Sequence, residues 1–118
     1  MVGHDSLDVA ATYCNMAVVF RKQGQYEKAL EYYQKDLDIT IKVVGHGHPL
    51  VATVYYNLAC LFASRDTEQC RIMLAKAEET GCLWKAVTIA HVQQDSDLDP
   101  VRHADWFSDL LSRGEAEK

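Results

Sequence analysis

The chain lacks the features that direct a protein to a bilayer or to nucleic acid. None of its apolar runs reaches the roughly 18 residues that a membrane-spanning helix requires. Its formal net charge is -5 with both signs interspersed, so no basic stripe is present to bind phosphates or anionic lipids. These absences predict a soluble, cytoplasmic protein that binds neither nucleic acid nor a membrane surface.

Motifs for catalysis and for metal binding are also missing. The sequence has no glycine-rich phosphate loop, no Gly-x-Ser-x-Gly elbow and no His-Glu-x-x-His motif. His46 and His48 have no third ligand at a helical or turn spacing. Four cysteines lie far apart without a Cys-x-x-Cys pair, namely Cys14, Cys60, Cys70 and Cys82. We therefore predict no enzyme, no cofactor and no metal site, and expect the cysteines to fill small apolar positions in a reducing compartment.

The chain does contain an internal repeat. The segment VAATYCNMAVVF, Val9 to Phe20, returns forty-two residues later as VATVYYNLACLF, Val51 to Phe62, with six of twelve positions identical. Repeats of one supersecondary unit cannot bury their apolar faces alone, so they stack on neighbours and create an extended concave surface. Such a surface suits the binding of another chain.

Apolar spacing within the first repeat predicts a helical hairpin. One apolar face with spacings of three and four ends at Phe20, and a break follows around Gly24. A second stripe begins at Tyr26 and continues to Ile41. Glycine suits the turn between the two helices because it tolerates backbone angles that other residues resist.

The second repeat carries its own start and stop signals. Pro49 suits the first turn of a helix, and Asp66 with Gln69 forms the pattern of a capping box for the next one. Gly81 ends that helix. The apolar pattern of Leu83, Trp84, Val87 and Ala90 then predicts a further helix of about three turns.

The C-terminal stretch is rich in aspartate and aromatic residues. We expect Asp99 to cap a helix that begins at Pro100 and Asp105 to cap one that begins at Trp106. The run of aspartates from residue 95 lacks the glycine and terminal glutamate of a calcium loop. The apolar residues either fold back as a cap or form a linear motif for a partner: Trp106, Phe107, Leu110 and Leu111. We favour the cap, because an exposed aromatic pair would be a large apolar patch.

These patterns predict a single all-α domain over residues 1–118. Its repeats occupy residues 8–43 and 49–80, its capping helices residues 83–112, and a polar tail residues 113–118. The repeats are antiparallel hairpins stacked as a solenoid.

The motif residues of the first unit resemble the tetratricopeptide repeat, in particular the long-period form of kinesin light chains and nephrocystin-like proteins. The likeness covers residues 8 to 80 and depends on the combination Asn15-Met16-Ala17, Phe20, Gly24-Gln-Tyr26, Ala29, Tyr33, Leu37 and Gly45-His-Gly-His48-Pro49. The second unit departs at its turn, Ser64 to Thr67, which lacks the glycine and tyrosine. The resemblance implies a stack of hairpins whose first helices line a concave face.

The resemblance also implies a peptide-binding groove. Its positions in this sequence are Cys14, Asn15, Val18, Arg21, Lys22, Tyr56, Asn57, Cys60 and Ser64. Asn15 and Asn57 are the leading candidates because an amide can pair with any peptide backbone, although a hydrogen bond between helices would explain them equally well. The lysine and asparagine clamp of chaperone-binding members is replaced here by Cys14 and Val18.

We therefore expect a protein interaction module that holds a peptide or a partner segment. Arg21 and Lys22 favour a ligand of acidic and apolar character. The alternative is a structural module that self-associates, without a separate peptide site.

Two further expectations concern particular positions. Asp36 replaces the small alanine usual in the family and should find a donor, most plausibly the hydroxyl of Tyr55 or Tyr56. Gly3-His4 precedes Gly45-His46 by forty-two residues, which suggests that the chain opens inside a linker between repeats. We expect either the C-terminal part of a longer array or a homodimer through the first hairpin, burying Val9, Tyr13, Val19 or Tyr32.

Overall fold

The first hairpin consists of α1 (Leu7–Lys22) and α2 (Tyr26–Val44) in a computed structural model that describes residues 6–117. Ser6 caps α1, its hydroxyl accepting a hydrogen bond from an amide of the first turn. Gly24 has a φ of 75°, the left-handed conformation that the predicted turn requires. The expected break between the two helices is therefore confirmed.

The second hairpin consists of α3 (Pro49–Phe62) and α4 (Thr67–Glu79). α3 begins at the proline, as predicted, and the Nδ1 atom of His48 accepts a hydrogen bond from an amide of its first turn. The Asp66 carboxylate caps α4 by accepting from the amide of Gln69 at 3.1 Å. This half of the predicted capping box is confirmed.

The predicted fifth helix of three turns is wrong. The chain forms two short helices instead, α5 (Leu83–Ala86) and α6 (Ile89–Gln94). Val87 between them is extended, with φ -134° and ψ 133°. The Thr88 hydroxyl caps α6 by accepting from the amide of His91, so a new helix starts where the apolar spacing suggested a continuous one.

A 3-10 helix, η1 (Ser96–Val101), follows α6. The expectation that Asp99 caps a helix beginning at Pro100 is wrong, because Pro100 lies inside η1. The cap is Asp95, whose carboxylate accepts from the amide of Asp97 at 3.0 Å. An aspartate bonding to the amide two residues later favours this tight turn over an α-helical start.

The last helix, α7, spans Asp105–Ala116. It starts one residue earlier than predicted, with Ala104 at the cap position and no side-chain cap, so the expected role of Asp105 is wrong. It also continues through residues 113–116, which were expected to belong to a polar tail. Phe107 and Leu110 of this helix are only 1% and 2% exposed, which confirms their predicted burial.

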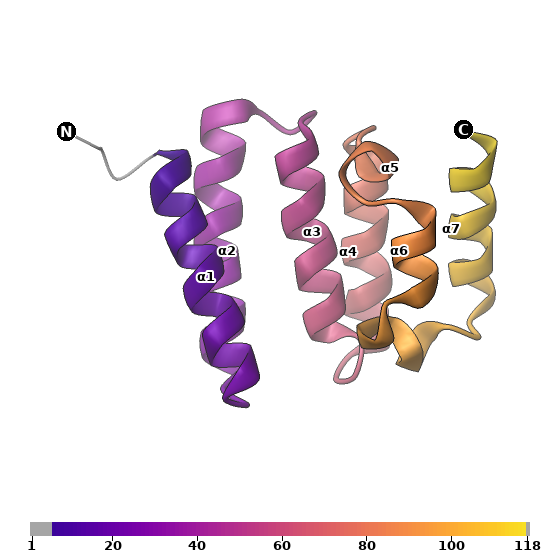
Figure 1. Ribbon diagram of the computed structural model, residues 1–118, viewed down its shortest axis with the longest axis horizontal. Coiled ribbons are helices and arrows are strands. Elements are labelled where there is room, and N and C mark those ends of the chain that lie inside the picture. Colours follow the sequence, from indigo (N-terminus) through magenta and orange to yellow (C-terminus); the bar gives the residue numbers. More distant parts are fainter. Residues whose placement is uncertain (1–5, 118) are drawn as a thin grey trace.

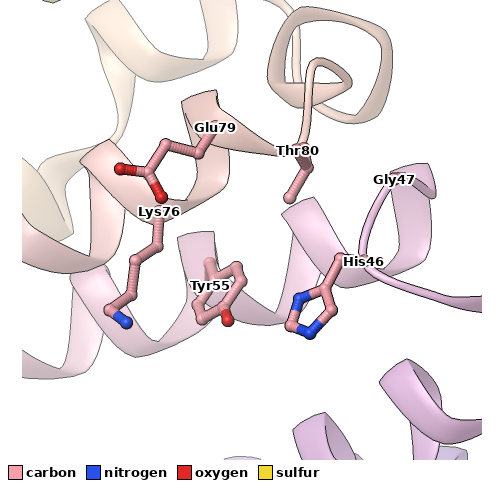
Figure 2. Close-up of a pocket in the computed structure, with 6 residues that line it drawn as sticks. All are labelled: His46, Gly47, Tyr55, Lys76, Glu79 and Thr80. Carbon is pink, nitrogen blue, oxygen red and sulfur yellow. The ribbon is translucent and has the colours of Figure 1, made fainter.

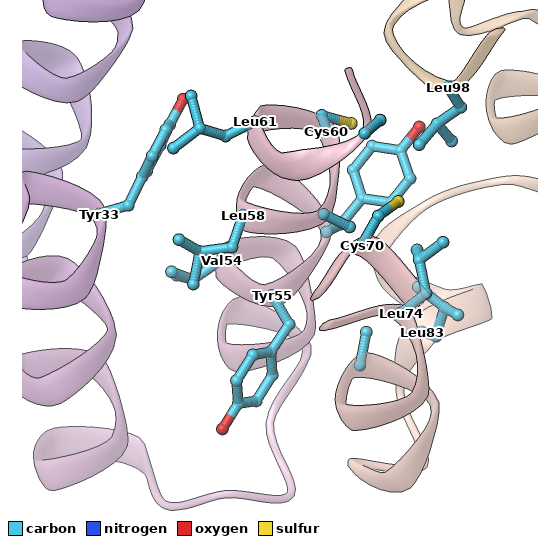
Figure 3. Close-up of a cluster of buried hydrophobic side chains, with 14 of the residues drawn as sticks. Tyr33, Val54, Tyr55, Leu58, Cys60, Leu61, Cys70, Leu74, Leu83 and Leu98 are labelled. Carbon is cyan, nitrogen blue, oxygen red and sulfur yellow. The ribbon is translucent and has the colours of Figure 1, made fainter. Parts of the chain in front are cut away.

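The helices follow one another along the longest axis of the molecule in sequence order (Figure 1). Small residues allow α1 and α2 to pack closely, since Ala17 and Ala29 are completely buried. Figure 3 shows part of the core between the second helix and the C-terminal helices. The largest fully buried side chains include Tyr33, Leu58, Leu74, Leu98 and Phe107.

Within residues 6–117 every regular element is helical, which confirms the predicted all-α solenoid. None of the described helices is long and apolar enough to cross a membrane. Gly3 and His4, which suggested the linker between repeats, lie outside the described residues.

Candidate functional site

A cavity of about 270 Å³ opens between the first helices of the two hairpins. α1 and α3 supply its walls, and α2 supplies two buried polar residues. We call it the carboxylate cavity, and it is lined by Leu7, Ala10, Ala11, Cys14, Asp36, Thr40, Leu50, Thr53, Val54 and Asn57. Leu7 and Leu50 at its rim are 38% and 43% exposed, so apolar surface borders the opening.

Asp36 lies at the base of this cavity and is only 5% exposed. Its Oδ1 atom accepts a hydrogen bond from the Thr40 hydroxyl at 2.8 Å, one turn further along α2. The predicted partnership with Tyr55 or Tyr56 is therefore wrong, because Thr40 and Cys14 are the hydrogen-bonding partners of Asp36 and the Tyr56 hydroxyl donates to Asp95 instead. Burial raises the pKa of Asp36, and hydrogen bonds from Thr40 and Cys14 only partly offset this.

The other end of the groove contains Arg21, which contributes to a second cavity of about 190 Å³. This cavity is lined by Arg21, Gly24, Tyr26, Cys60, Leu61, Ser64 and Arg65. The Arg21 guanidinium forms an ion pair of 2.9 Å with Asp97 from η1. The chain's own C-terminal region thus supplies an acidic group to the groove residue that was expected to attract an acidic ligand.

Asp95 links the C-terminal region to α3 through hydrogen bonds. The Tyr56 hydroxyl donates to its Oδ2 at 2.6 Å, and the Cys60 thiol donates to the same oxygen at 3.7 Å. His91 Nε2 lies 3.4 Å away. Although burial opposes it, the hydrogen bonds from Tyr56 and the Asp97 amide, together with His91, lower the pKa of Asp95.

Arg102 holds the backbone of this region in place. Its guanidinium donates to the carbonyl oxygens of Gln93 and Asp95 and to the Asp99 carboxylate. We call residues 95–99 the acidic segment, and its apolar member Leu98 is fully buried. The acidic segment is therefore anchored by a side chain in the core as well as by its charges.

Three possible metal ligands meet at this contact. The ligand atoms of Cys60, Asp95 and Asp97 lie within 4.8 Å of one another. Each group already has a partner, since Asp95 accepts from Tyr56 and Asp97 pairs with Arg21. Burial also raises the pKa of Cys60, which disfavours the thiolate that a metal would require. Docking of the acidic segment accounts for the arrangement.

Six of the nine predicted groove residues lie at one of these two ends. Cys14 and Asn57 line the carboxylate cavity, while Arg21, Cys60 and Ser64 line the second cavity. Tyr56 is buried and bonded to the acidic segment. The remaining three line neither cavity: Asn15 and Lys22 are exposed, and Val18 packs against the core.

Further cavities lie away from this groove, and one of about 220 Å³ is lined by residues of α4 and α7. Figure 2 shows a polar one of about 340 Å³ where the hairpins join, lined by Tyr55, His46, Lys76 and Glu79 among others. A larger cavity of about 520 Å³, which we call the back cavity, is lined by residues of α2, α3 and α4. Its apolar residues are Leu30, Leu58, Phe62 and Met73, with Glu27 and Glu31 beside them.

Sequence reasoning missed the two carboxylates that define the ends of the groove. Asp36 carried a signal, since it stands where the family has a small alanine, but its contact with the groove was not expected. Asp95 is 39 residues from Tyr56 in sequence, and nothing in the local pattern indicates that pairing.

The family model of the tetratricopeptide repeat matches residues 8–80, which is more than half of the 118 residues. The matched region covers both hairpins, α1 to α4, except for Leu7 at the start of α1. No relative matches among curated proteins. With stacked antiparallel hairpins over the matched residues, the chain belongs to the tetratricopeptide repeat family.

Proposed function

We propose that the chain binds an extended segment of a partner protein in the groove between α1 and α3. Tetratricopeptide repeats generally mediate interactions between proteins, and the observation that supports this groove is the carboxylate cavity. Its open, largely apolar walls come from the first helices of two successive hairpins. The Asn57 side chain at this cavity carries donors and an acceptor for a peptide backbone.

The Arg21 end of the groove favours acidic and apolar character in a partner. Asp97 and Leu98 already supply that chemistry within the chain. A partner segment of the same kind has to displace Asp97, so we expect Asp97→Asn to strengthen its binding.

The forty-two-residue period supports a relationship to the long-period subfamily of kinesin light chains and nephrocystin-like proteins.

Filling the carboxylate cavity tests the proposed function. Peptides selected on the chain from a phage-displayed random library serve as probes. Ala11 is an exposed wall residue, so Ala11→Trp should fill the opening without disturbing the core, and should weaken binding by about tenfold or more. Ala90→Trp, at an exposed position of α6, is the matched control. Equal affinity of Ala11→Trp and the unmodified chain for every selected peptide would reject this groove as the site.

The alternative function, self-association, is supported by a different observation. Met16 and Val19 on α1 are 37% and 52% exposed, which leaves apolar surface on the first hairpin. Light scattering across concentration distinguishes the two. A dimer that Val19→Glu converts to a monomer supports the assembly function, whereas a monomer at all concentrations contradicts it.

A further inference from the structure

Asp36 is a buried carboxylate with hydrogen bonds but no counter-ion among residues 6–117. Its hydrogen-bonding partners in that range are the Thr40 hydroxyl and the Cys14 thiol, neither of which carries a positive charge. Lys35 is adjacent in sequence, but its ammonium lies 5.5 Å and 5.7 Å from the ring centres of Tyr13 and Tyr32. Buried charges in proteins are normally paired, so a positive group placed beside the Asp36 carboxylate would stabilise it.

The cavity above Asp36 has the shape and chemistry to receive a long basic side chain. Its volume is about 270 Å³, and the walls nearest the rim are aliphatic. Lysine and arginine bury their methylene stems along apolar surface while the charged end finds a polar partner. Here the polar partner would be Asp36 at the base, and the stem would lie between Leu7 and Leu50.

Charge complementarity favours a cation over other occupants of this cavity. An acidic side chain would place a second negative charge beside the Asp36 carboxylate, and an aliphatic one would leave that carboxylate without a counter-ion. An ammonium or guanidinium group would replace water lost on binding with a charge-assisted hydrogen bond. The remaining lining is neutral, so it neither repels a cation nor supplies one.

We propose that the carboxylate cavity binds a lysine or arginine side chain of the partner segment, flanked by apolar residues that rest on Leu7 and Leu50. This inference rests on the proposed function and specifies its ligand at the carboxylate cavity, which we call the open end of the groove. The ligand charge expected at this cavity is positive, whereas Arg21 at the other end favours a negative group, which Asp97 of the chain already supplies. Asp36 is the specificity-determining residue.

The experiment begins with the same phage-displayed library, selected in parallel on the unmodified chain, on Asp36→Asn and on Asp38→Asn. Asp38 lies on the same helix but is exposed, which makes it a matched control. We expect lysine or arginine to be enriched at one position on the unmodified chain and on Asp38→Asn, and this enrichment to disappear on Asp36→Asn. Thermal unfolding of each variant checks that it is folded.

Titration of synthetic peptides gives a second arm, in which the ligand is altered as well as the protein. The best peptide is compared with a copy in which its lysine is norleucine, or its arginine citrulline. We expect the neutral copy to bind the unmodified chain about tenfold more weakly than the original peptide does. The original peptide and its neutral copy should bind Asp36→Asn with equal affinity. Binding of the neutral copy within about twofold of the original overturns the inference.

The two proposals fail in different ways. If Ala11→Trp abolishes binding but the neutral copy binds normally, the groove stands and the lysine or arginine preference is wrong. If no selected peptide is weakened by Ala11→Trp, or no binder is recovered, both the proposed function and this inference are overturned.

Discussion

The two ends of the groove place a carboxylate in opposite situations. At the open end, Asp36 has neutral partners only among the described residues, and burial raises its pKa. At the other end, which we call the closed end because the acidic segment contacts Arg21 and Tyr56 there, Asp95 accepts from Tyr56 and lies near His91. The pKa of Asp95 is lowered despite partial burial. The same chemical group is thus unfavourable at one end and stabilising at the other. The closed end contributes to the fold, whereas the open end retains a charge for a partner to neutralise.

Removal of the anchor of the closed end should have the largest effect on stability. Leu98 is fully buried, so Leu98→Ala should lower the free energy of unfolding by about 3 kcal/mol, as cavities in well-packed cores do. Leu50→Ala at the rim of the open end should cost less than about 1 kcal/mol, because that side chain is 43% exposed. Urea unfolding measures both. Equal losses would contradict the assignment of a structural end and a binding end.

The last helix, α7, should tolerate little additional volume where it packs against Trp84. A Cβ atom on Gly114 of α7 would lie 2.6 Å from the Trp84 ring. Gly114→Ala should therefore destabilise the fold by about 1 to 2 kcal/mol, despite the better helix propensity of alanine. In the control Gly47→Ala, the nearest atom to the new Cβ would be 3.9 Å away, and we expect little change in melting temperature. A stabilised Gly114→Ala would show that α7 does not pack against this ring.

The hydroxyl that joins α3 to the acidic segment should contribute less. Tyr56→Phe removes the donor to Asp95 and should cost about 1.5 kcal/mol, a typical value for a hydrogen bond to a charged group. Tyr55→Phe is the matched control, since the Tyr55 ring lines the polar cavity of Figure 2 instead. Hydrogen exchange should also show faster exchange in residues 95–98 of Tyr56→Phe. Unchanged exchange there would mean that Arg102 and Leu98 alone hold the segment.

Acid should change the contributions of Asp36 and Asp95 to the free energy of unfolding in opposite directions. This is the smallest effect that we expect. The pKa of Asp36 is raised in the folded state, so the ionised carboxylate disfavours folding at neutral pH. This penalty begins to disappear as the pH falls through the folded-state pKa, and it is gone below 3.8, where the carboxylate of the unfolded chain is also protonated. The unmodified chain should therefore gain stability relative to Asp36→Asn on acidification. Asp95 has a lowered pKa, so its contribution is present above 3.8 and is lost as the pH falls through its folded value.

Urea unfolding at about pH 7, 5 and 3.5 measures these differences, with Asp36→Asn and Asp95→Asn each compared to the unmodified chain at the same pH. The stability advantage over Asp95→Asn should shrink at the lowest pH. Parallel changes for the two variants would contradict the difference between the open and closed ends.

The sequence predicted the elements whose signals are local. The break at Gly24, the start at Pro49 and the Asp66 cap each depend on residues within a few positions, and all three are present. The helix predicted across Val87 failed because apolar spacing does not register the competing cap at Thr88.

The candidate site was predictable only in part, because its defining contacts join distant segments. The repeat indicated which helices line the groove, but not that the acidic segment lies against Tyr56 and Arg21. Asp36 stood out as a charge at an apolar position. Its actual partner is Thr40, one turn along the same helix, and the family pattern of small residues does not indicate a hydrogen bond within the helix.

Chemical-shift mapping with a selected peptide tests most directly whether the open end is the binding end. A peptide chosen on the unmodified chain is titrated into the isotope-labelled protein, and the amide signals are followed. The largest shifts should fall on residues of the carboxylate cavity, among them Cys14 and Asn57. Shifts centred on Leu30 and Met73 of the back cavity, with none in the groove, would contradict the account.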